Sequence, residues 1–371
     1  MARPFGLLDR LIVRELAALT FATLGFTTLL YLVIDYADRA PMIGRHAFEM
    51  AALQFYANKA AVIAYQLAPA ALIIGGAMLV AQLSRAGELG ALLAIGTRPL
   101  RIAAPIAGFG LAMAVGVFAL GEAVVVGADQ RMDEITLKGF GNWGDWGRYH
   151  PETTWMRGQG GSRFYKLGRF RLGGWEPVTV LEIVAPFSLA RRLDARRIEP
   201  TSTGSWRLLD AVEMRYSADP TVSGGQIARR QAPELFERFP DTVPELLLRT
   251  GRPRQMRWTE LTEQTVRRAS AGQPVREWEL ALAERASQAG LAIAGALSGF
   301  AVSLGMMGER RRLPYASSIM LGLMLTFTLW GVSTVTHAAA LSGRLPPFLA
   351  GGATAFVASL LAVVALASLK A

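Results

Sequence analysis

The residues of this 371-residue sequence that could catalyse a reaction are few and far apart. The three histidines, His46, His150 and His337, form no pair at helical spacing, so they predict no metal site. None of the four lysines stands in a Gly-x-x-x-x-Gly-Lys-Ser/Thr phosphate loop, and no Gly-x-Ser-x-Gly nucleophile elbow occurs. We therefore predict no catalytic residue, no metal and no cofactor in this chain. If the chain takes part in active transport, the energy must come from elsewhere.

A group of charged residues near position 40 could bind a charged ligand. Asp35 and Arg39 are four residues apart, so on a continuing helix they share a face and can pair. Asp38 and Arg45 stand close by. One interpretation is a polar lip that contacts a charged substrate, as a lipid gate, at the outer leaflet. The other is a helix end that marks the water boundary, and the pattern leaves both open.

A second charged pair opens a short amphipathic segment at residues 85–96. Arg85 and Glu88 are three residues apart, and Gly96 is placed as a helix C-cap. Three leucines between them follow helical spacing, namely Leu89, Leu92 and Leu93. An exposed apolar stripe of this kind needs a partner. The segment is predicted either to dock to another protein or to rest on lipid.

Membrane helices must position these residues, because 52% of the sequence is hydrophobic and only 18% is charged. Crossing the hydrocarbon core takes about 20 apolar residues. Six runs are long enough: residues 16–34, 60–83, 102–126, 289–307, 315–336 and 346–369. The first run is too long for a cleavable signal peptide and lacks a small-x-small site, so we expect it to be retained as a span.

Arginines concentrate at one set of span ends and predict the orientation. They are Arg3, Arg10, Arg14, Arg85, Arg98, Arg101, Arg310, Arg311 and Arg312. By the positive-inside rule, both termini and these loops are cytoplasmic, and the long polar segment is periplasmic. This distribution accounts for much of the net charge of +10, so we do not expect a nucleic-acid partner. The sequence has no cysteine and therefore no disulfide framework.

The polar segment at residues 127–285 has the alternation of β-strands. Strands are predicted at 161–167, 177–184 and 205–216, separated by Gly- and Pro-rich turns. In the last of these, four apolar residues are predicted to share one face: Trp206, Leu208, Val212 and Met214. That face is either a packed core or a groove for lipid. Short strands at this spacing indicate a sandwich, a jelly roll or an open barrel, and a helix is predicted from residue 258 to 271.

The predicted fold is a polytopic α-helical membrane protein with six transmembrane helices and an inserted periplasmic all-β, jelly-roll-like domain. Helices one to three occupy residues 1–126 and include a cytoplasmic coupling loop at 84–101. The β domain, ending in a short helix, occupies residues 127–285, and helices four to six occupy residues 286–371.

Several short motifs on this frame resemble the lipopolysaccharide export permeases, the LptF/LptG family, over essentially the whole chain. The motifs are Leu8-Asp9-Arg10, Glu88-Leu89 with Gly96-Thr97, Trp155-Met156-Arg157, Phe164-Tyr165, Arg257-Trp258-Thr259-Glu260-Leu261 with Gly272, the arginines at 310–312, and Gly343-x-Leu-Pro-Pro. Each motif is short, and their order and spacing carry the resemblance. Residues 155–216 are more similar to the LptG branch.

The resemblance implies a permease subunit of an ABC-type exporter in the bacterial inner membrane, which extracts lipopolysaccharide and passes it to a periplasmic bridge. Its partners would be a second, LptF-like permease in a heterodimer, an LptB-like ATPase dimer and an LptC/LptA-like bridge. Residues 85–96 would dock to the ATPase with the leucines as the buried stripe, and the first and fifth helices would form lateral gates. Where some relatives have lysines at the outer end of the first helix, this sequence has Asp35 and Pro41-Met42.

Two other functions remain open from the residues alone. The β domain of a membrane-anchored scaffold could grip a periplasmic partner without transport. An ion-coupled transporter would need paired carboxylates within the spans, and Glu122, near the outer end of the third span, is the single candidate. Co-purification of a nucleotide-binding subunit would favour the exporter over the scaffold.

Overall fold

The structure is a computed structural model that describes residues 6–43, 50–139, 154–158, 161–171, 173–185, 188–201, 204–217, 226–241, 253–270, 274–307 and 314–368. The chain forms two compact units. The first contains residues 1–144, 253–258 and 276–371, and we call it the membrane unit. The second contains residues 145–252 and 259–275, and we call it the β unit.

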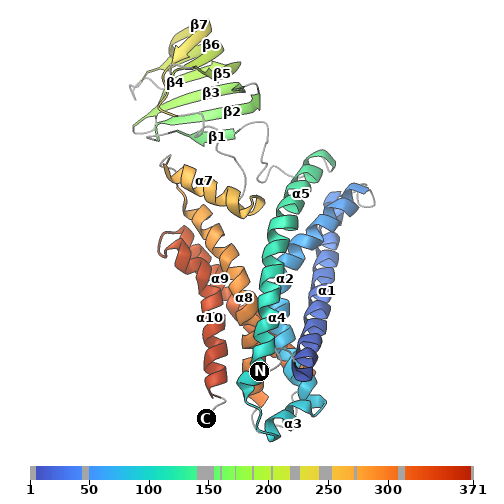
Figure 1. Cartoon of the computed structure of the whole chain (residues 1–371). Helices are drawn as coiled ribbons and strands as arrows, with labels where there is room; N and C mark the ends of the chain where they lie inside the picture. Colours follow the sequence, from blue (N-terminus) through green and yellow to red (C-terminus); the bar gives the residue numbers. More distant parts are fainter. Residues whose placement is uncertain are drawn as a thin grey trace. The chain divides into compact units, whose positions relative to one another are not determined.

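Six long apolar helices, found within the described residues, confirm the predicted spans (Figure 1). The membrane unit consists of α1 (Leu7–Ile43), α2 (Met50–Arg85), the short α3 (Glu88–Ala94), α4 (Pro99–Leu120), the π-helical turn η2 (Gly121–Val125), α5 (Val126–Gly139), the 3₁₀ turn η3 (Pro253–Gln255), α8 (Arg276–Met307), α9 (Tyr315–Leu341) and α10 (Pro347–Ser368). The third span is longer than predicted, because η2 and α5 continue α4 beyond its apolar part.

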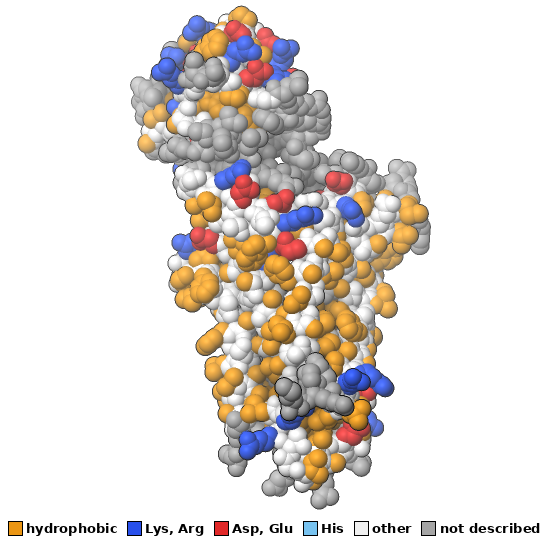
Figure 2. All heavy atoms as spheres, in the orientation of Figure 1, with side chains coloured by type: hydrophobic (Ala, Val, Ile, Leu, Met, Phe, Trp, Pro, Cys, Tyr) orange, Lys and Arg blue, Asp and Glu red, His pale blue; other side chains and the backbone are white. Residues whose placement is uncertain are grey.

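Helices α2 and α8 form the centre of the membrane unit. In the most apolar stretch of each span, 67% of the residues are buried in α2 and 61% in α8. The corresponding share is 11–28% in the other four spans. Small residues bring the two backbones together, because a Cβ on Gly299 of α8 would lie 2.0 Å from the carbonyl oxygen of Ile73. The outer helices expose large apolar side chains such as Phe26, Phe327 and Phe356, as expected for helices in contact with lipid. Figure 2 shows hydrophobic side chains along the helical part, with charged groups toward its ends.

The β unit is an antiparallel sheet in which the strands follow one another in order. Its strands are β1 (Thr154–Arg157), β2 (Arg163–Arg171), β3 (Gly174–Val184), β4 (Ser188–Ala195), β5 (Arg197–Pro200), β6 (Trp206–Tyr216) and β7 (Gln226–Glu237). Strands β4 and β5 continue one another between β3 and β6. The predicted inserted β domain is thus confirmed, and the described strands form one continuous sheet. The predicted helix is α7 (Trp258–Ser270).

The alternation of buried and exposed residues along this sheet shifts by one residue at Arg196 and Asp210. Trp206 and Leu208 are buried before this point in β6, and Ala211 and Glu213 are buried after it. Asp210 has a φ of 52°, and its carboxylate pairs with Arg196, which separates β4 from β5. A non-glycine residue in this conformation breaks the simple alternation of a strand. The predicted shared face of Trp206, Leu208, Val212 and Met214 is therefore wrong: Val212 and Met214 lie on the opposite face and are half-buried.

Candidate functional site

The membrane unit contains a mostly apolar cavity of about 750 Å³. Helices α1, α2, α8, α9 and α10 line it, so segments from both halves of the sequence build it. Its wall includes Tyr31 of α1, Pro69 and Ile73 of α2, and Phe327 and Trp330 of α9. Apolar walls with a few polar groups are typical of a site for an apolar or amphipathic molecule.

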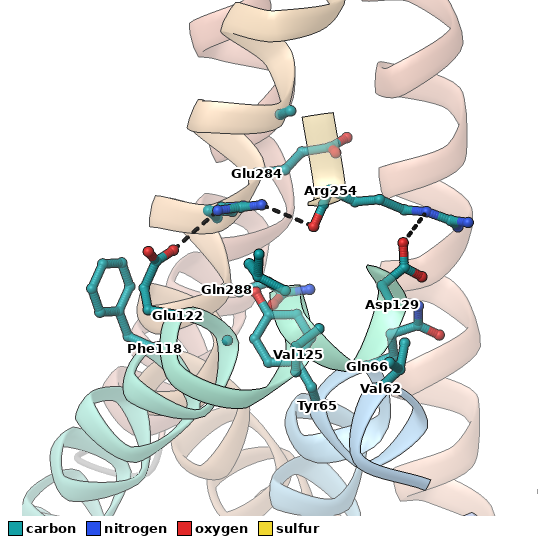
Figure 3. A pocket seen from close by; sticks show the side chains of 14 residues that line it. Val62, Tyr65, Gln66, Phe118, Glu122, Val125, Asp129, Arg254, Glu284 and Gln288 are labelled. Atoms are coloured by element: carbon teal, nitrogen blue, oxygen red, sulfur yellow. Dashed lines mark hydrogen bonds and ion pairs between the residues drawn. The ribbon is translucent and has the colours of Figure 1, made fainter. Parts of the chain in front are cut away.

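A second, smaller cavity of about 250 Å³ adjoins the first and is more polar (Figure 3). Gln66 of α2 and Glu284 and Gln288 of α8 line both cavities, so they stand at the junction. Nδ1 of His337, from α9, lies 2.6 Å from Oε1 of Glu284. The chain therefore presents an apolar chamber with a polar end. Sequence analysis missed these residues, although polar side chains at the margins of apolar runs were a signal for them.

An ion-pair network lies beside the smaller cavity. Glu122, in the π-helical turn η2, accepts a hydrogen bond from Arg285 at 3.0 Å and one from the backbone N–H of Trp258 at 2.8 Å. Arg285 also donates to the backbone carbonyl of Pro253 at 3.1 Å. Nε of Arg254 lies 3.3 Å from Oδ2 of Asp129. Figure 3 shows this ion pair. The network holds residues 253–258 against η2, α5 and α8 within the membrane unit.

The charged residues predicted as a lipid gate lie at one end of α1. The predicted pair is present, because Arg39 Nε donates to Asp35 Oδ1 at 3.1 Å. Asp35 also accepts a hydrogen bond from Lys59 of α2 at 2.5 Å, a contact that sequence analysis missed. Lys59 is buried and lies over the rings of Tyr31, Phe55 and Tyr56. Asp38 is exposed, and Arg45 lies outside the described residues.

The segment predicted to dock to an ATPase forms α3, and Gly96 ends it as predicted. Gly96 has a φ of 82°. The backbone N–H of Gly96 donates to the carbonyl oxygen of Leu93, and the backbone N–H of Thr97 donates to the carbonyl oxygen of Leu92. These two bonds make a Schellman C-cap. Glu88 is exposed, and the guanidinium of Arg85 lies 4.9 Å above the ring of Tyr315.

The leucine stripe of α3 faces the protein's own helices. Leu89 is fully buried, and Leu92 and Leu93 pack against the core of the membrane unit, which includes Ile12 and Ile102. The prediction that the leucines form an exposed stripe for a partner is therefore wrong, since they cover the ends of α1, α2 and α4. The outward face instead carries Glu88, Ala91 and Ile95, of which Ile95 is 78% exposed.

Of the residues predicted for a lipid groove, Trp206 and Leu208 belong to the packed core of the β unit. Trp206 lies against Trp175, with ring centroids 5.9 Å apart, and its indole N–H donates to the backbone carbonyl of Asp241 at 3.2 Å. These contacts fit a packed core. Val212 and Met214 are half-buried on the other face.

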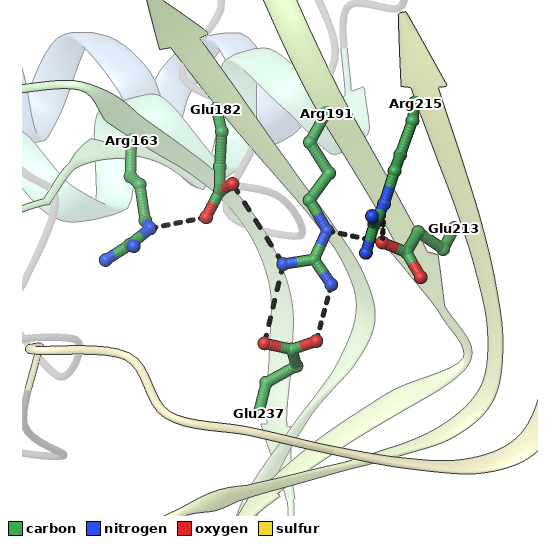
Figure 4. A network of polar contacts seen from close by, with 6 residues as sticks. All are labelled: Arg163, Glu182, Arg191, Glu213, Arg215 and Glu237. Carbon is green, nitrogen blue, oxygen red and sulfur yellow. Dashed lines mark hydrogen bonds and ion pairs between the residues drawn. The ribbon is translucent and has the colours of Figure 1, made fainter. Parts of the chain in front are cut away.

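Charged side chains of five strands, β2, β3, β4, β6 and β7, meet around Arg191 (Figure 4). Arg191 donates to Glu213 at 2.8 Å and also to Glu237, and Arg215 donates to the same Glu213 oxygen at 2.8 Å. Burial raises the pKa of Glu213, but Arg215 and Arg191 outweigh it, so the pKa lies below its ordinary value. The network thus keeps a buried carboxylate ionised at neutral pH.

Six long apolar helices, five of which line a chamber with a polar end, together with an inserted β domain define a polytopic membrane protein. The chain belongs to the family of the lipopolysaccharide export system permease LptF/LptG, whose model matches residues 10–368. No curated protein matches the chain. It is therefore an inner-membrane permease component of a lipopolysaccharide export ABC transporter and not itself an enzyme. The family description covers both permeases, so the closer likeness to the LptG branch stays a prediction.

Proposed function

We propose that this subunit takes lipopolysaccharide from the inner membrane into the chamber of about 750 Å³ and passes it to a periplasmic bridge. The chamber carries the proposal. Its walls come from α1 and α9, the first and fifth spans, which the family resemblance makes the lateral gates. An amphiphile fits such a site because its acyl chains are buried against apolar walls while its headgroup meets the polar end.

The ATPase is proposed to dock at the outward face of α3, through Glu88 and the exposed Ile95. Two contacts join this region to other helices. Arg85 stacks on Tyr315 at the start of α9, and Asp9 of α1 accepts hydrogen bonds from Arg101 at the start of α4. A movement of α3 would therefore reach both α1 and α9, the two gate helices.

The proposed complex contains a second, LptF-like permease, an LptB-like ATPase dimer that binds the ATP, and an LptC/LptA-like bridge that receives the lipid. This chain is proposed to hold no cofactor. The positive-inside rule supports an orientation with both termini and α3 in the cytoplasm and the β unit in the periplasm. In that orientation, Asp35, Arg39 and Lys59 lie toward the outer leaflet, where the lipid would enter.

Reconstitution tests this function. The chain would be co-expressed with a second permease and an ATPase, inserted into vesicles containing lipopolysaccharide, and supplied with ATP and a soluble bridge protein. We expect ATP-dependent transfer of the glycolipid to the bridge, and reduced transfer when Ser333, which lines the chamber, is replaced by Trp. Transfer that continues without an ATPase, or with the chamber filled in this way, would contradict the proposal.

A further inference from the structure

The third span contains an irregular turn, η2, between α4 and α5. Its backbone hydrogen bonds join residues i and i+5 instead of i and i+4, so it accommodates one residue more than an α-helical turn. Single π-helical turns of this kind occur frequently at functional sites. If η2 became α-helical, every residue of α5 would advance by one helical position. That change would rotate α5 by about 100° relative to α4.

The residues of α5 that would rotate hold residues 253–258, which we call the return segment because the chain there comes back to the membrane unit from the β unit. The side-chain amide of Gln130 donates to the backbone carbonyl of Gln255 at 2.8 Å. The side-chain amide of Gln255 donates to Asp133 at 2.5 Å, and Asp129 pairs with the arginine before it. Asp129 and Asp133 are one turn apart on α5, so a rotation of about 100° would break these contacts together.

The turn η2 also contacts the return segment directly. Glu122 accepts the backbone N–H of Trp258 at 2.8 Å and a hydrogen bond from Arg285 of α8 at 3.0 Å. Trp258 is the first residue of α7, where a backbone N–H has no acceptor within its own helix, and Glu122 supplies one. The smaller cavity, of about 250 Å³, borders η2, and the side chains of Glu122 and Asp129 line it (Figure 3). Space for these side chains to move is therefore present beside the turn.

We propose that η2 is a two-state switch, which holds the return segment as a π-helical turn and releases it as an α-helical turn. The proposal rests on the ATP-driven transport proposed above. It adds the element through which a movement of the spans reaches the chain that leads to and from the β unit. Helix α4 begins just after α3 and runs into η2, so a movement of α3 would be transmitted along one continuous helix. The contacts of Glu122 and α5 favour the held state described here, and ATP binding by the partner is expected to favour the released one.

Hydrogen exchange of the return segment tests the switch. The complex of this chain with a second permease and an ATPase would be placed in lipid nanodiscs and measured without nucleotide and with ATP and vanadate. Glu122→Gln keeps an acceptor oxygen and removes the charge. Its matched control is Glu134→Gln, because Glu134 is exposed on α5. A third variant lacks Ala123, which removes the additional residue of η2 and makes the turn α-helical while α5 keeps its present orientation.

In the wild type, we expect the amides of the return segment to exchange about tenfold faster with ATP and vanadate than without. Glu122→Gln should exchange fast in both conditions, because a hydrogen bond to a charged group is weakened. The variant without Ala123 should exchange slowly in both, and Glu134→Gln should behave as the wild type.

Wild-type rates that do not change with nucleotide, or equal rates in Glu122→Gln and Glu134→Gln, would overturn the proposal. These two comparisons decide the question even if the variant without Ala123 fails to assemble. Lipid transfer measured on the same samples tests the proposed function separately. Its absence would refute that function, and the exchange rates would still decide whether η2 switches.

Discussion

Asp9 accepts hydrogen bonds from both terminal nitrogens of Arg101, at 2.6 and 2.9 Å, and so ties the start of α1 to the start of α4. The carboxylate also accepts the backbone N–H of Gly6 at 3.1 Å, which caps the first turn of α1. Asp9 is buried, and planar two-bond pairing of this kind fixes orientation as well as distance. Because α4 begins just after α3, this pair links the proposed docking helix to a proposed gate helix.

Breaking this pair is expected to uncouple ATP hydrolysis from lipid transfer. Arg101→Ala should lower transfer per ATP by about fivefold, within the usual range for coupling between sites. The double variant Asp9→Arg with Arg101→Asp should recover part of the lost transfer per ATP. Transfer and ATP hydrolysis would be measured together in vesicles. Arg98→Ala is the control, because Arg98 is exposed and directly precedes α4, three residues before Arg101. An equal loss in that variant would argue against a specific role for the pair.

The two faces of α3 should respond differently to mutation. Leu89→Ala removes a fully buried side chain and is expected to cost about 2–5 kcal/mol of stability. Glu88→Arg and Ile95→Asp change the outward face and should leave the thermal unfolding temperature of the isolated permease unchanged while reducing the ATPase that co-purifies with it. If the ATPase still co-purifies fully with both outward variants, α3 is not the docking element.

Local patterns predicted the elements of this fold, and long-range contacts decided the site. Apolar runs of sufficient length marked the six spans. The predicted strand 161–167 overlaps β2 and the predicted strand 177–184 lies within β3, because length and alternation depend on neighbouring residues alone. The pair of Asp35 with Lys59 joins residues 24 apart on two helices, so no spacing rule could indicate it. The network around Arg191 likewise needs strands brought together by the sheet.

Two errors of sequence analysis have a common physical cause, which is that an apolar stripe does not say what it packs against. The leucines of α3 have the spacing of a docking helix, yet they cover their own bundle. In β6, simple alternation places Val212 on the same face as Trp206. The backbone at Asp210 shifts the alternation by one residue, so Val212 lies on the opposite face. A non-glycine residue with a positive φ is uncommon, even for aspartate, so the pattern alone gave no reason to expect it.

The pairing of Glu213 predicts that the β unit loses stability in acid. Its pKa in the folded protein lies below the ordinary value of 4.5, so its contribution is present above that pH and is lost as the pH falls through the lower native pKa. Glu213→Gln should cost about 1–2 kcal/mol at pH 7. Hydrogen exchange of the β6 amides in the full-length protein should be faster in the variant at pH 7, and the difference should shrink below pH 4.5. A difference that does not change with pH would refute the role of this carboxylate.

The close contact of α2 with α8 predicts that replacing two different glycines of α8 by alanine will change the stability of the membrane unit by very different amounts. A Cβ on Gly299 would lie 2.0 Å from the backbone oxygen of Ile73, whereas a Cβ on Gly305 would meet nothing within 4 Å. Gly299→Ala must therefore push the helices apart and should destabilise the membrane unit by about 1–3 kcal/mol. Gly305→Ala, with the same gain in helix propensity, should be neutral or slightly stabilising. Unfolding in detergent would compare the two variants, and equal midpoints would show that the backbones of α2 and α8 do not approach as closely as described.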